Sequence, residues 1–420
     1  MTHPLRIALL SYRSKPHSGG QGVYVRHLSR ELAALGHRVE VFSGQPYPEL
    51  DPGPLLNRVP SLDLYRDDDP FRTPPLSHWR DGIDAVEVAT MWTAGFPEPL
   101  TFSLRALRAL RHRADLDVVH DNQTLGYGML GLVRLGFPLV TTIHHPITVD
   151  RRIELESATG WQRLGKRRWY GFVRMQGRVA RRVGPILVPS RSSADDVSRE
   201  FGVAPERLSV VPMGVDTRSF RERPEVERVP GRIVTVASAD SPLKGVATLL
   251  RALAKLATER EVSLIVVGRP NEGGATDRLV DALSLRGRVE FVQGIDDDAL
   301  ARLLASAQVA VVPSLYEGFS LPAVEAMACA TPLVASRAGA LPEVVGEAAV
   351  LVAPGDDAEL AAAVGALLDD PEARRRLGRA AWERVQRRYT WRAVAEATAE
   401  RYREAADRRP AARRRPAPAG

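Results

Sequence analysis

Apolar residues recur along the whole chain in short runs of strand length, and amphipathic stretches of helical period separate these runs. Strands of a buried parallel sheet are continuously apolar, whereas the helices that cover them repeat about every 3.6 residues. The alternation occurs in two series and predicts two parallel sheets with helices on both faces. The expected strands are residues 5–12, 38–43, 117–121, 138–144, 185–190 and 207–212, then 232–238, 262–268, 289–294, 309–313, 332–336 and 350–353. Helices are expected at residues 22–35, 101–113 and 161–182, and a further helix is expected to begin at residue 245.

A chain of 420 residues is too long for one compact core of usual size, so two domains are expected. The expected boundaries are an N-terminal domain at 1–215, a linker at 216–231, a C-terminal domain at 232–388, a helix at 389–407 and a disordered basic tail at 408–420. Pro224 and Pro230 suit the linker. Residues 45–99 lack periodicity, and a loop of that length is usually functional or mobile.

The segment at 317–325, Glu-Gly-Phe-Ser-Leu-Pro-Ala-Val-Glu, follows an apolar run and enters a helix. The start of a helix offers free backbone N–H groups and the positive end of its dipole, which suits a phosphate. The carboxylates of Glu317 and Glu325 would instead accept hydrogen bonds from hydroxyls. This combination indicates a nucleotide-sugar site. The alternative is an ordinary strand-turn-helix with two solvated glutamates.

Further motifs surround this segment in a regular order. They are Gly-Gly-Gln-Gly at 19–22, His120 at a strand end, Met-Gly-Val-Asp at 213–216, Pro-Leu-Lys-Gly at 242–245 and Val-Val-Gly at 266–268. The ordered set resembles the retaining glycosyltransferases of family 4 over about residues 5–405. The resemblance implies the α/β fold called GT-B, in which two Rossmann-like parallel-sheet domains face a central cleft and a C-terminal helix crosses back to the N-terminal domain.

The resemblance also implies roles for individual residues. Glu317 would contact the donor sugar, and Glu325 would bind the ribose hydroxyls. The backbone N–H groups of Phe319, Ser320 and Leu321 would hold the diphosphate. The residues expected at the donor are Gly20, Gly22, Ser238, Lys244, Gly268, Arg269, Gly294, Ile295, Glu317, Gly318, Phe319, Ser320, Leu321 and Glu325. The expected catalytic residues are Glu317, Lys244 and His120, and those expected at the acceptor are Gln21, His144 and His145.

Lys244 precedes a helix start and is the best candidate to neutralise the leaving diphosphate. A solvated surface lysine is the alternative. Family members usually carry an arginine six residues earlier, where this chain has Ser238. Either Arg269 or another cation substitutes for that arginine, or backbone N–H groups hold the phosphates.

The glycines at 19–22 also fit a dinucleotide-binding turn, but such a site wants an acidic residue just past the second strand, where this chain has Phe-Ser-Gly-Gln at 42–45. His120 would hydrogen-bond a sugar hydroxyl, or else it is a structural histidine. His144 and His145 fit an acceptor contact and a loop role equally well, and no third ligand nearby makes them a metal site.

The net charge of +7 is unevenly distributed. Residues 161–182 hold eight basic and no acidic residues and interleave aromatic side chains, whereas residues 401–420 hold seven arginines against Glu404 and Asp407. The first stretch fits an anionic membrane surface as well as a solvated helix face. The arginines of the tail are not accompanied by any nucleic-acid-binding signature, so no nucleic acid partner is expected.

The chain shows no apolar run of bilayer length and no secretory leader, so we expect a cytoplasmic protein, which could also sit at the inner face of the cell membrane. The single cysteine, Cys329, fits a reducing compartment and a buried, inert thiol. The acidic runs at 67–69 and 296–298 are expected to be solvated, the second as a helix cap. No metal and no cofactor are expected.

Together with these observations, the resemblance to family 4 implies a retaining glycosyltransferase that moves a sugar from a UDP- or GDP-sugar to a glycan, lipid or small-molecule acceptor. The resemblance implies same-face displacement, and no metal is expected. The alternatives are a GT-B relative of other chemistry, such as a sugar-nucleotide epimerase or a phosphorylase, and a non-catalytic module that binds sugar nucleotides or membranes. The sequence does not specify the sugar, the base, the acceptor or the oligomeric state.

Overall fold

The computed structural model describes residues 3–14, 20–66 and 69–408. Gly19, Asp67 and Asp68, and the tail from residue 409 onward, lie outside the described residues, so the expectations for them remain predictions. The chain forms two compact units. Unit 1 comprises Met1–Pro189, Ser193–Val211 and Val394–Gly420, and unit 2 comprises Ser190–Ser192 and Pro212–Ala393.

Unit 1 contains a seven-stranded parallel sheet in the order β3-β2-β1-β4-β5-β6-β7. The strands are β1 (Arg6–Ser11), β2 (Arg38–Ser43), β3 (Leu55–Arg58), β4 (Val118–Asn122), β5 (Leu139–Thr142), β6 (Ile186–Val188) and β7 (Leu208–Val210). The strand order reverses between β1 and β4, which pair directly. Such a reversal leaves a crevice beyond the carboxyl ends of the strands, where ligands of doubly wound sheets bind.

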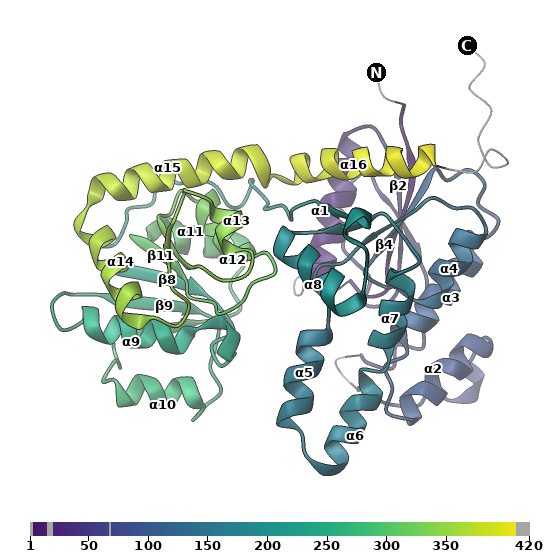
Figure 1. Cartoon of the computed structure of the whole chain (residues 1–420), viewed down its shortest axis with the longest axis horizontal. Coiled ribbons are helices and arrows are strands. Elements are labelled where there is room, and N and C mark those ends of the chain that lie inside the picture. Colours follow the sequence, from purple (N-terminus) through teal and green to yellow (C-terminus); the bar gives the residue numbers. More distant parts are fainter. Residues whose placement is uncertain (1–2, 15–19, 67–68, 409–420) are drawn as a thin grey trace. The chain divides into compact units, whose positions relative to one another are not determined.

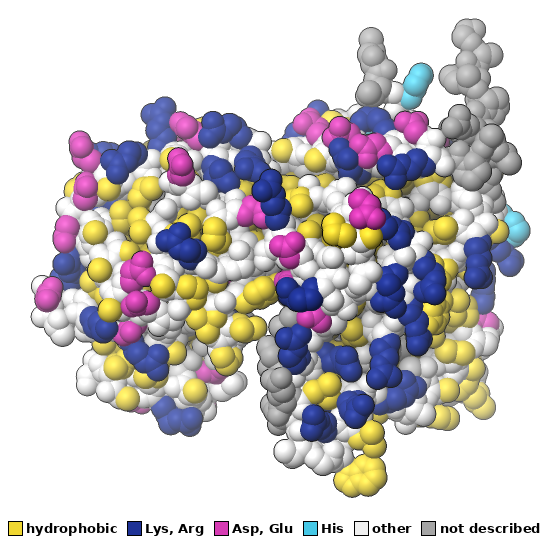
Figure 2. All heavy atoms as spheres, viewed as in Figure 1, with side chains coloured by type: hydrophobic (Ala, Val, Ile, Leu, Met, Phe, Trp, Pro, Cys, Tyr) yellow, Lys and Arg dark blue, Asp and Glu magenta, His cyan; other side chains and the backbone are white. Residues whose placement is uncertain are grey.

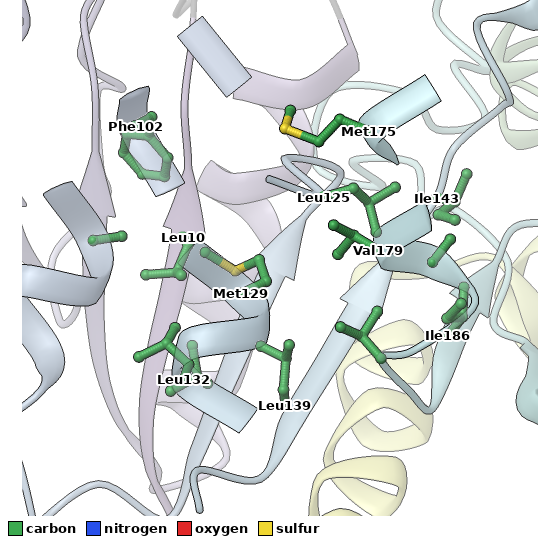
Figure 3. Packing of buried hydrophobic residues seen from close by; sticks show 14 of the residues in the cluster. Leu10, Phe102, Leu125, Met129, Leu132, Leu139, Ile143, Met175, Val179 and Ile186 are labelled. Carbon is green, nitrogen blue, oxygen red and sulfur yellow. The ribbon is translucent and has the colours of Figure 1, made fainter. Parts of the chain in front are cut away.

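Helices cover both faces of this sheet (Figure 1). The helices that lie wholly or mostly in unit 1 include α1 (Gly20–Ala34), α3 (Glu98–Leu110), α4 (Tyr127–Arg134), α5 (Thr148–Ser157), α6 (Gly160–Trp169), α7 (Phe172–Ala180), α8 (Arg191–Phe201) and α16 (Trp391–Asp407). In Figure 3, Leu10 of β1 and Leu139 of β5 lie near Met129 and Leu132 of α4, all within one buried cluster. This apolar packing holds the strand ends in place.

Two sequence expectations for unit 1 need correction. The segment 45–99 is not one long loop, because it contains β3 and α2 (Gly82–Trp92), the latter capped by Asp81. The single helix expected at 161–182 is two helices, α6 and α7, with a break at Tyr170 and Gly171. Glycine has low helix propensity, and it stands where α6 ends.

Unit 2 contains a six-stranded parallel sheet in the order β10-β9-β8-β11-β12-β13. The strands are β8 (Arg232–Val236), β9 (Ser263–Val267), β10 (Val289–Val292), β11 (Val309–Val312), β12 (Leu333–Ser336) and β13 (Val350–Val352). The helices are α9 (Val246–Leu256), α10 (Ala275–Ala282), α11 (Asp297–Ser306), α12 (Leu321–Ala328), α13 (Leu341–Val345), α14 (Asp357–Asp369) and α15 (Pro371–Arg388). Its buried cluster joins α9 and α14 to β8, β9 and β11. Among the described residues, no helix is long and apolar enough to cross a membrane.

Candidate functional site

Apart from Gly20 and Gly22, which belong to α1 of unit 1, the residues expected at the donor follow four neighbouring strands of unit 2. Gly294 and Ile295 follow β10, Gly268 and Arg269 follow β9, Ser238 and Lys244 follow β8, and the segment 317–325 follows β11. Parallel strands end at the same edge of a sheet, so these groups share one edge. The order of the sheet reverses between β8 and β11, which puts the carboxyl ends of these strands at the expected place for a ligand.

Lys244 and Glu317 form an ion pair in which Nζ lies 2.8 Å from Oε1. The Ser314 hydroxyl donates to the same Oε1 at 2.7 Å. Glu317 is 8% exposed, so two donors fix a nearly buried carboxylate. Lys244 is the more exposed partner, and its ammonium has three protons, of which this bond uses one.

The backbone explains why these two residues meet although they lie 73 positions apart. The Leu315 N–H donates to the Leu243 carbonyl at 2.8 Å, so the loop after β11 is bound to the loop after β8. Gly245 makes this approach sterically feasible. A Cβ there would lie 2.0 Å from the Pro313 carbonyl oxygen, and its φ of +66° is in the left-handed region.

The start of α12 has the features of an anion site. Ser320 precedes the helix with φ of +85°, a conformation that costs energy for a residue with a Cβ. Its side chain is buried, and its hydroxyl has no hydrogen-bond partner in the described structure. The first helical residue, Leu321, is followed by Pro322, which lacks an N–H. A strained, unsatisfied group at a helix start is typical of a position that a ligand completes.

Glu325 lies on α12 one helical turn beyond Leu321. Burial, with a smaller contribution from the Asp297 carboxylate, raises the pKa of Glu325 to about 7. The carboxylate of Glu317 has different surroundings, because a cation and a hydroxyl both bind it. The two carboxylates of the motif therefore stand in different environments, one ion-paired and one desolvated.

The loops after β8 and β9 are tied together near Gly268. A Cβ at Gly268 would lie 2.1 Å from the Ala237 carbonyl oxygen, so only glycine fits. Asp240 accepts from the Asn271 N–H at 2.6 Å and from the Thr276 N–H. The Asn271 hydrogen bond lowers the pKa of Asp240, with a further contribution from Thr276. These contacts fix the loop after β9 to the loop after β8.

Among the described residues, Ser238 stands where the family pattern has an arginine, and Arg269 is the candidate substitute for that arginine. Ser238 and Arg269 are both exposed, and the Ser238 carbonyl accepts from the Ser241 N–H at 3.0 Å. Lys244 is therefore the cation that this edge of the sheet holds against Glu317. Gly294, at the end of β10, has φ of +69° with open space around it.

In unit 1 the structure places His120 within β4, fully buried. Its Nδ1 lies 2.5 Å from the Tyr402 hydroxyl and its Nε2 lies 2.7 Å from the Thr142 hydroxyl. Both ring nitrogens are therefore occupied, and a sugar contact would have to displace one of these partners. Burial lowers the pKa of His120 to about 3, with His144 adding to the effect, so the ring is neutral. The expected contact with the donor sugar stays a prediction.

His144 follows β5 and is held by its neighbours while leaving polar atoms unused. Its Nε2 lies 2.8 Å from the Asn122 Oδ1, and its N–H donates to the Gln123 Oε1. The Tyr24 ring packs edge-on against it at 4.7 Å. Within the described part of the chain, His144 Nδ1 and Asn122 Nδ2 are buried and have no partner. These atoms are available to a polar ligand.

The other residues expected in unit 1 lie near the same strand ends. Gly20 and Gly22 belong to the first turn of α1, after β1. The Gln21 side chain hydrogen-bonds to Tyr12. Burial raises the pKa of Tyr12, and this hydrogen bond acts in the opposite direction. The His145 carbonyl accepts from Gln123 Nε2 at 2.8 Å, while its side chain is exposed.

The acidic run at 296–298 has structural partners. Asp296 caps α11 by accepting from the Ala299 N–H at 2.8 Å, and Asp298 pairs with Arg223 and Arg302. Asp69, the described member of the other run, pairs with Arg72 at 3.3 Å. These carboxylates are engaged in local ion pairs or a cap.

Sequence reasoning missed several residues of these sites. Ser314 fixes Glu317, and Asn122, Thr142 and Tyr24 surround the two histidines of unit 1. Asn122 and Thr142 are the last residues of β4 and β5, so the strand-end rule could have found them. Tyr402 gave no such signal, because it lies 282 positions from His120.

Two family models match the chain, one described as Glycosyltransferase Family 4 over residues 18–219 and one as Glycosyl transferases group 1 over residues 218–384. The MMP alpha-(1->4)-mannosyltransferase of Mycolicibacterium hassiacum is 58% identical over 96% of this chain and 98% of its own length. This protein therefore belongs to glycosyltransferase family 4 and is a glycosyltransferase.

Solved structures agree with the fold. Sucrose-phosphate synthase from Thermosynechococcus elongatus superposes with a TM-score of 0.68 and 26% identity, covering 95% of this chain and 98% of that one. HepE from Anabaena, solved with UDP and glucose, gives a TM-score of 0.67 at 18% identity over 94% of this chain and 98% of its own. The predicted α/β fold of GT-B type, with two Rossmann-like parallel-sheet units, is confirmed.

Proposed function

We propose that this protein is a retaining glycosyltransferase that moves a sugar from a nucleoside-diphosphate sugar to a hydroxyl of an acceptor. Unit 2 binds the donor and unit 1 binds the acceptor. The observation that carries the proposal is the group at the carboxyl edge of the unit 2 sheet, where Lys244, Glu317 and the unpartnered Ser320 hydroxyl gather at the start of α12.

Each part of a nucleoside-diphosphate sugar finds a chemically matched group at this edge. The diphosphate accepts from the N–H groups at the start of α12, from Ser320 and from the two remaining Lys244 protons. Glu317 Oε1 takes both hydrogen bonds described above, so Oε2 can accept from a sugar hydroxyl. Glu325 accepts from the ribose hydroxyls, because a carboxylate is a hydrogen-bond acceptor and a hydroxyl can donate to it.

The same groups support same-face displacement rather than a covalent intermediate. Glu317 is ion-paired and hydrogen-bonded, which lowers its nucleophilicity, so we assign it to positioning the sugar. The bond from the anomeric carbon to the donor phosphate breaks, the acceptor oxygen bonds to the same face, and the leaving phosphate takes the acceptor proton. Lys244 and the α12 N–H groups stabilise the growing negative charge. The step is proposed to need no metal.

The sugar is proposed to be mannose, because the relative from Mycolicibacterium hassiacum carries mannosyltransferase in its name. An α-linked product from an α-linked donor is retention. GDP is the first donor nucleotide to test, and UDP is the second. The acceptor, whether glycan, lipid or small molecule, would hydrogen-bond His144 Nδ1 and Asn122 Nδ2. We propose a cytoplasmic reaction, where sugar nucleotides are made and where the lone Cys329 stays reduced.

Thermal shift with GDP-, UDP- and ADP-sugars tests the donor site directly. The expected result is a rise in melting temperature with one donor in the wild type that Lys244→Ala and Glu325→Ala both abolish. Lys255→Ala is the matched control, because Lys255 pairs with Asp357 on the surface of the same unit. A rise that survives both site substitutions would contradict the assignment.

Product analysis tests the reaction. Incubation with the donor and α-mannosides, followed by NMR of the anomeric proton, should show an α linkage formed equally well with and without EDTA. A β linkage would contradict retention, and loss of activity in EDTA would contradict the metal-free step. Release of a free sugar epimer, or phosphate-dependent cleavage of a glycan, would favour a different GT-B chemistry.

A further inference from the structure

A basic groove in unit 1 is lined by none of the strand-end residues described above. It is a cavity of about 260 Å³ between α5, α7 and the end of α8. The polar side chains that line it are Thr148, Arg151, Arg174, Arg178, Arg181 and Glu200. Figure 2 shows Lys and Arg side chains gathered over the part of unit 1 that holds α5 to α7.

The groove carries more positive than negative charge. Four guanidinium groups, which stay protonated at any physiological pH, face one carboxylate. That carboxylate, Glu200, already accepts from Arg152 at 2.8 Å. Like charges brought together at this density repel one another unless an anion lies between them. The composition of the groove thus indicates an anionic ligand.

Two polar atoms in the groove are left without partners. Thr148 Oγ1 and Arg151 Nε are buried, and no described atom hydrogen-bonds to either of them. Both are donors that a ligand oxygen could satisfy, and buried donors without partners are uncommon. Thr148 is also the first residue of α5, whose start has no side-chain cap. The groove therefore offers specific hydrogen-bond donors to a ligand in addition to its positive charge.

Other arginines of the groove are held in place by neutral partners. Arg178 Nη1 donates to the Tyr127 hydroxyl at 3.1 Å, and Arg181 Nη1 donates to the Phe201 carbonyl at 2.6 Å. Neither partner neutralises charge, and each guanidinium keeps further N–H groups for a ligand. A planar guanidinium with a fixed orientation matches the oxygens of a phosphate.

We propose that this groove binds the phosphate group of a ligand. A tetrahedral phosphate offers several acceptor oxygens to arginine forks and to the Thr148 hydroxyl at once, and the groove volume admits such a group with part of its ester. The phosphate can belong to a soluble ester or to the headgroup of an anionic phospholipid. The second source is suggested by α6 beside the groove, where Trp161 is 86% exposed and Leu164 is 57% exposed. This binding is independent of the sugar transfer.

Binding of glycerol 3-phosphate to the full chain by calorimetry tests the site. The double variant Arg151→Gln/Arg174→Gln removes two cations of the groove. Arg163→Gln/Arg167→Gln removes the same charge from exposed positions of α6, outside the cavity, and is the matched control. The expected result is a loss of about tenfold or more in affinity for the groove variant, while the control stays within about twofold of wild type. Arg174→Gln alone, at an exposed position, should show a smaller loss if the double variant is unstable.

Sedimentation with phosphatidylcholine vesicles, with and without phosphatidylglycerol, distinguishes the sources. Binding to anionic vesicles that only the groove variant loses supports the headgroup, and binding of glycerol 3-phosphate without vesicle binding supports a soluble ester. The proposal is overturned if the wild type binds neither probe, or if both double variants lose binding equally. Binding that Lys244→Ala abolishes and Arg151→Gln/Arg174→Gln leaves intact would place the phosphate in unit 2 and also overturn it.

Discussion

The carboxyl-end edges of the two parallel sheets carry different groups. In unit 2 the strand ends carry charge, with Lys244 against Glu317 and the start of α12 beside them. In unit 1 they carry buried neutral groups, because burial lowers the pKa of both His120 and His144 to about 3. A diphosphate needs cations and N–H groups, whereas sugar hydroxyls need neutral donors and acceptors. Under the proposed function, one sheet edge would act mainly through electrostatics and the other mainly through hydrogen bonds.

The largest effect is expected from Lys244→Ala, which removes the cation that pairs with Glu317. The variant should lose about 100- to 1000-fold in kcat/KM, because charge on the leaving phosphate is then stabilised only by N–H groups and Ser320. Steady-state kinetics with Lys255→Ala alongside would measure it. A loss below tenfold would mean that the two sheet edges do not differ in the way proposed.

Glu325 provides a test through the pH dependence of stability. Its pKa is about 7 in the folded protein, above the ordinary value of 4.5, so the folded state binds the proton more tightly than the unfolded state. The stability of the wild type should therefore fall as pH rises from about 4.5 to 7 and then level off. Glu325→Gln should remove this component and be more stable than wild type at pH 8 by on the order of 1–3 kcal/mol.

Urea unfolding of both proteins at pH 5 and pH 8 measures that difference. Other buried carboxyls, among them Glu98 with a pKa raised to about 7, contribute the same slope in both proteins and cancel in the comparison. Equal differences between variant and wild type at the two pH values would show that Glu325 is not desolvated.

In unit 1, His144→Ala should raise the KM for the acceptor by about tenfold and leave donor affinity unchanged, because one directed hydrogen bond is lost. His112→Ala, at an exposed position of the same unit, is the control. Separate titrations of donor and acceptor test whether unit 1 binds the acceptor alone. A change in donor affinity in His144→Ala would contradict that assignment.

The smallest effect is expected at Ser320. Ser320→Gly should relieve the left-handed conformation and stabilise the protein by about 0.5–1 kcal/mol, since glycine adopts φ of +85° without a Cβ penalty. Ser320→Ala should keep the strain. Both variants lose the hydroxyl and should bind the donor diphosphate a few times more weakly. Thermal melting and nucleotide titration of the pair separate strain from ligand contact.

Much of the fold followed from local pattern. The strand runs 38–43 and 309–313 were expected within one residue of β2 and β11, because buried strands are continuously apolar. The prediction of one long loop at 45–99 was wrong. The strand β3 is short and only half-buried, and its pairing with β2 is a contact that local pattern does not indicate. The break between α6 and α7 was missed because basic and aromatic residues recur on both sides of it.

For the sites, the sequence by itself determined which residues stand at strand ends, because chain order and parallel pairing bring the segments after β8, β9, β10 and β11 to one edge. Only the tertiary structure decided their partners. It joined Lys244 to Glu317 across 73 positions and enclosed His120 with Tyr402 from the far end of the chain. The reason is physical: strand propensity acts over neighbouring residues, whereas ion pairs, burial and the resulting pKa values depend on side chains that only folding brings within a few ångströms.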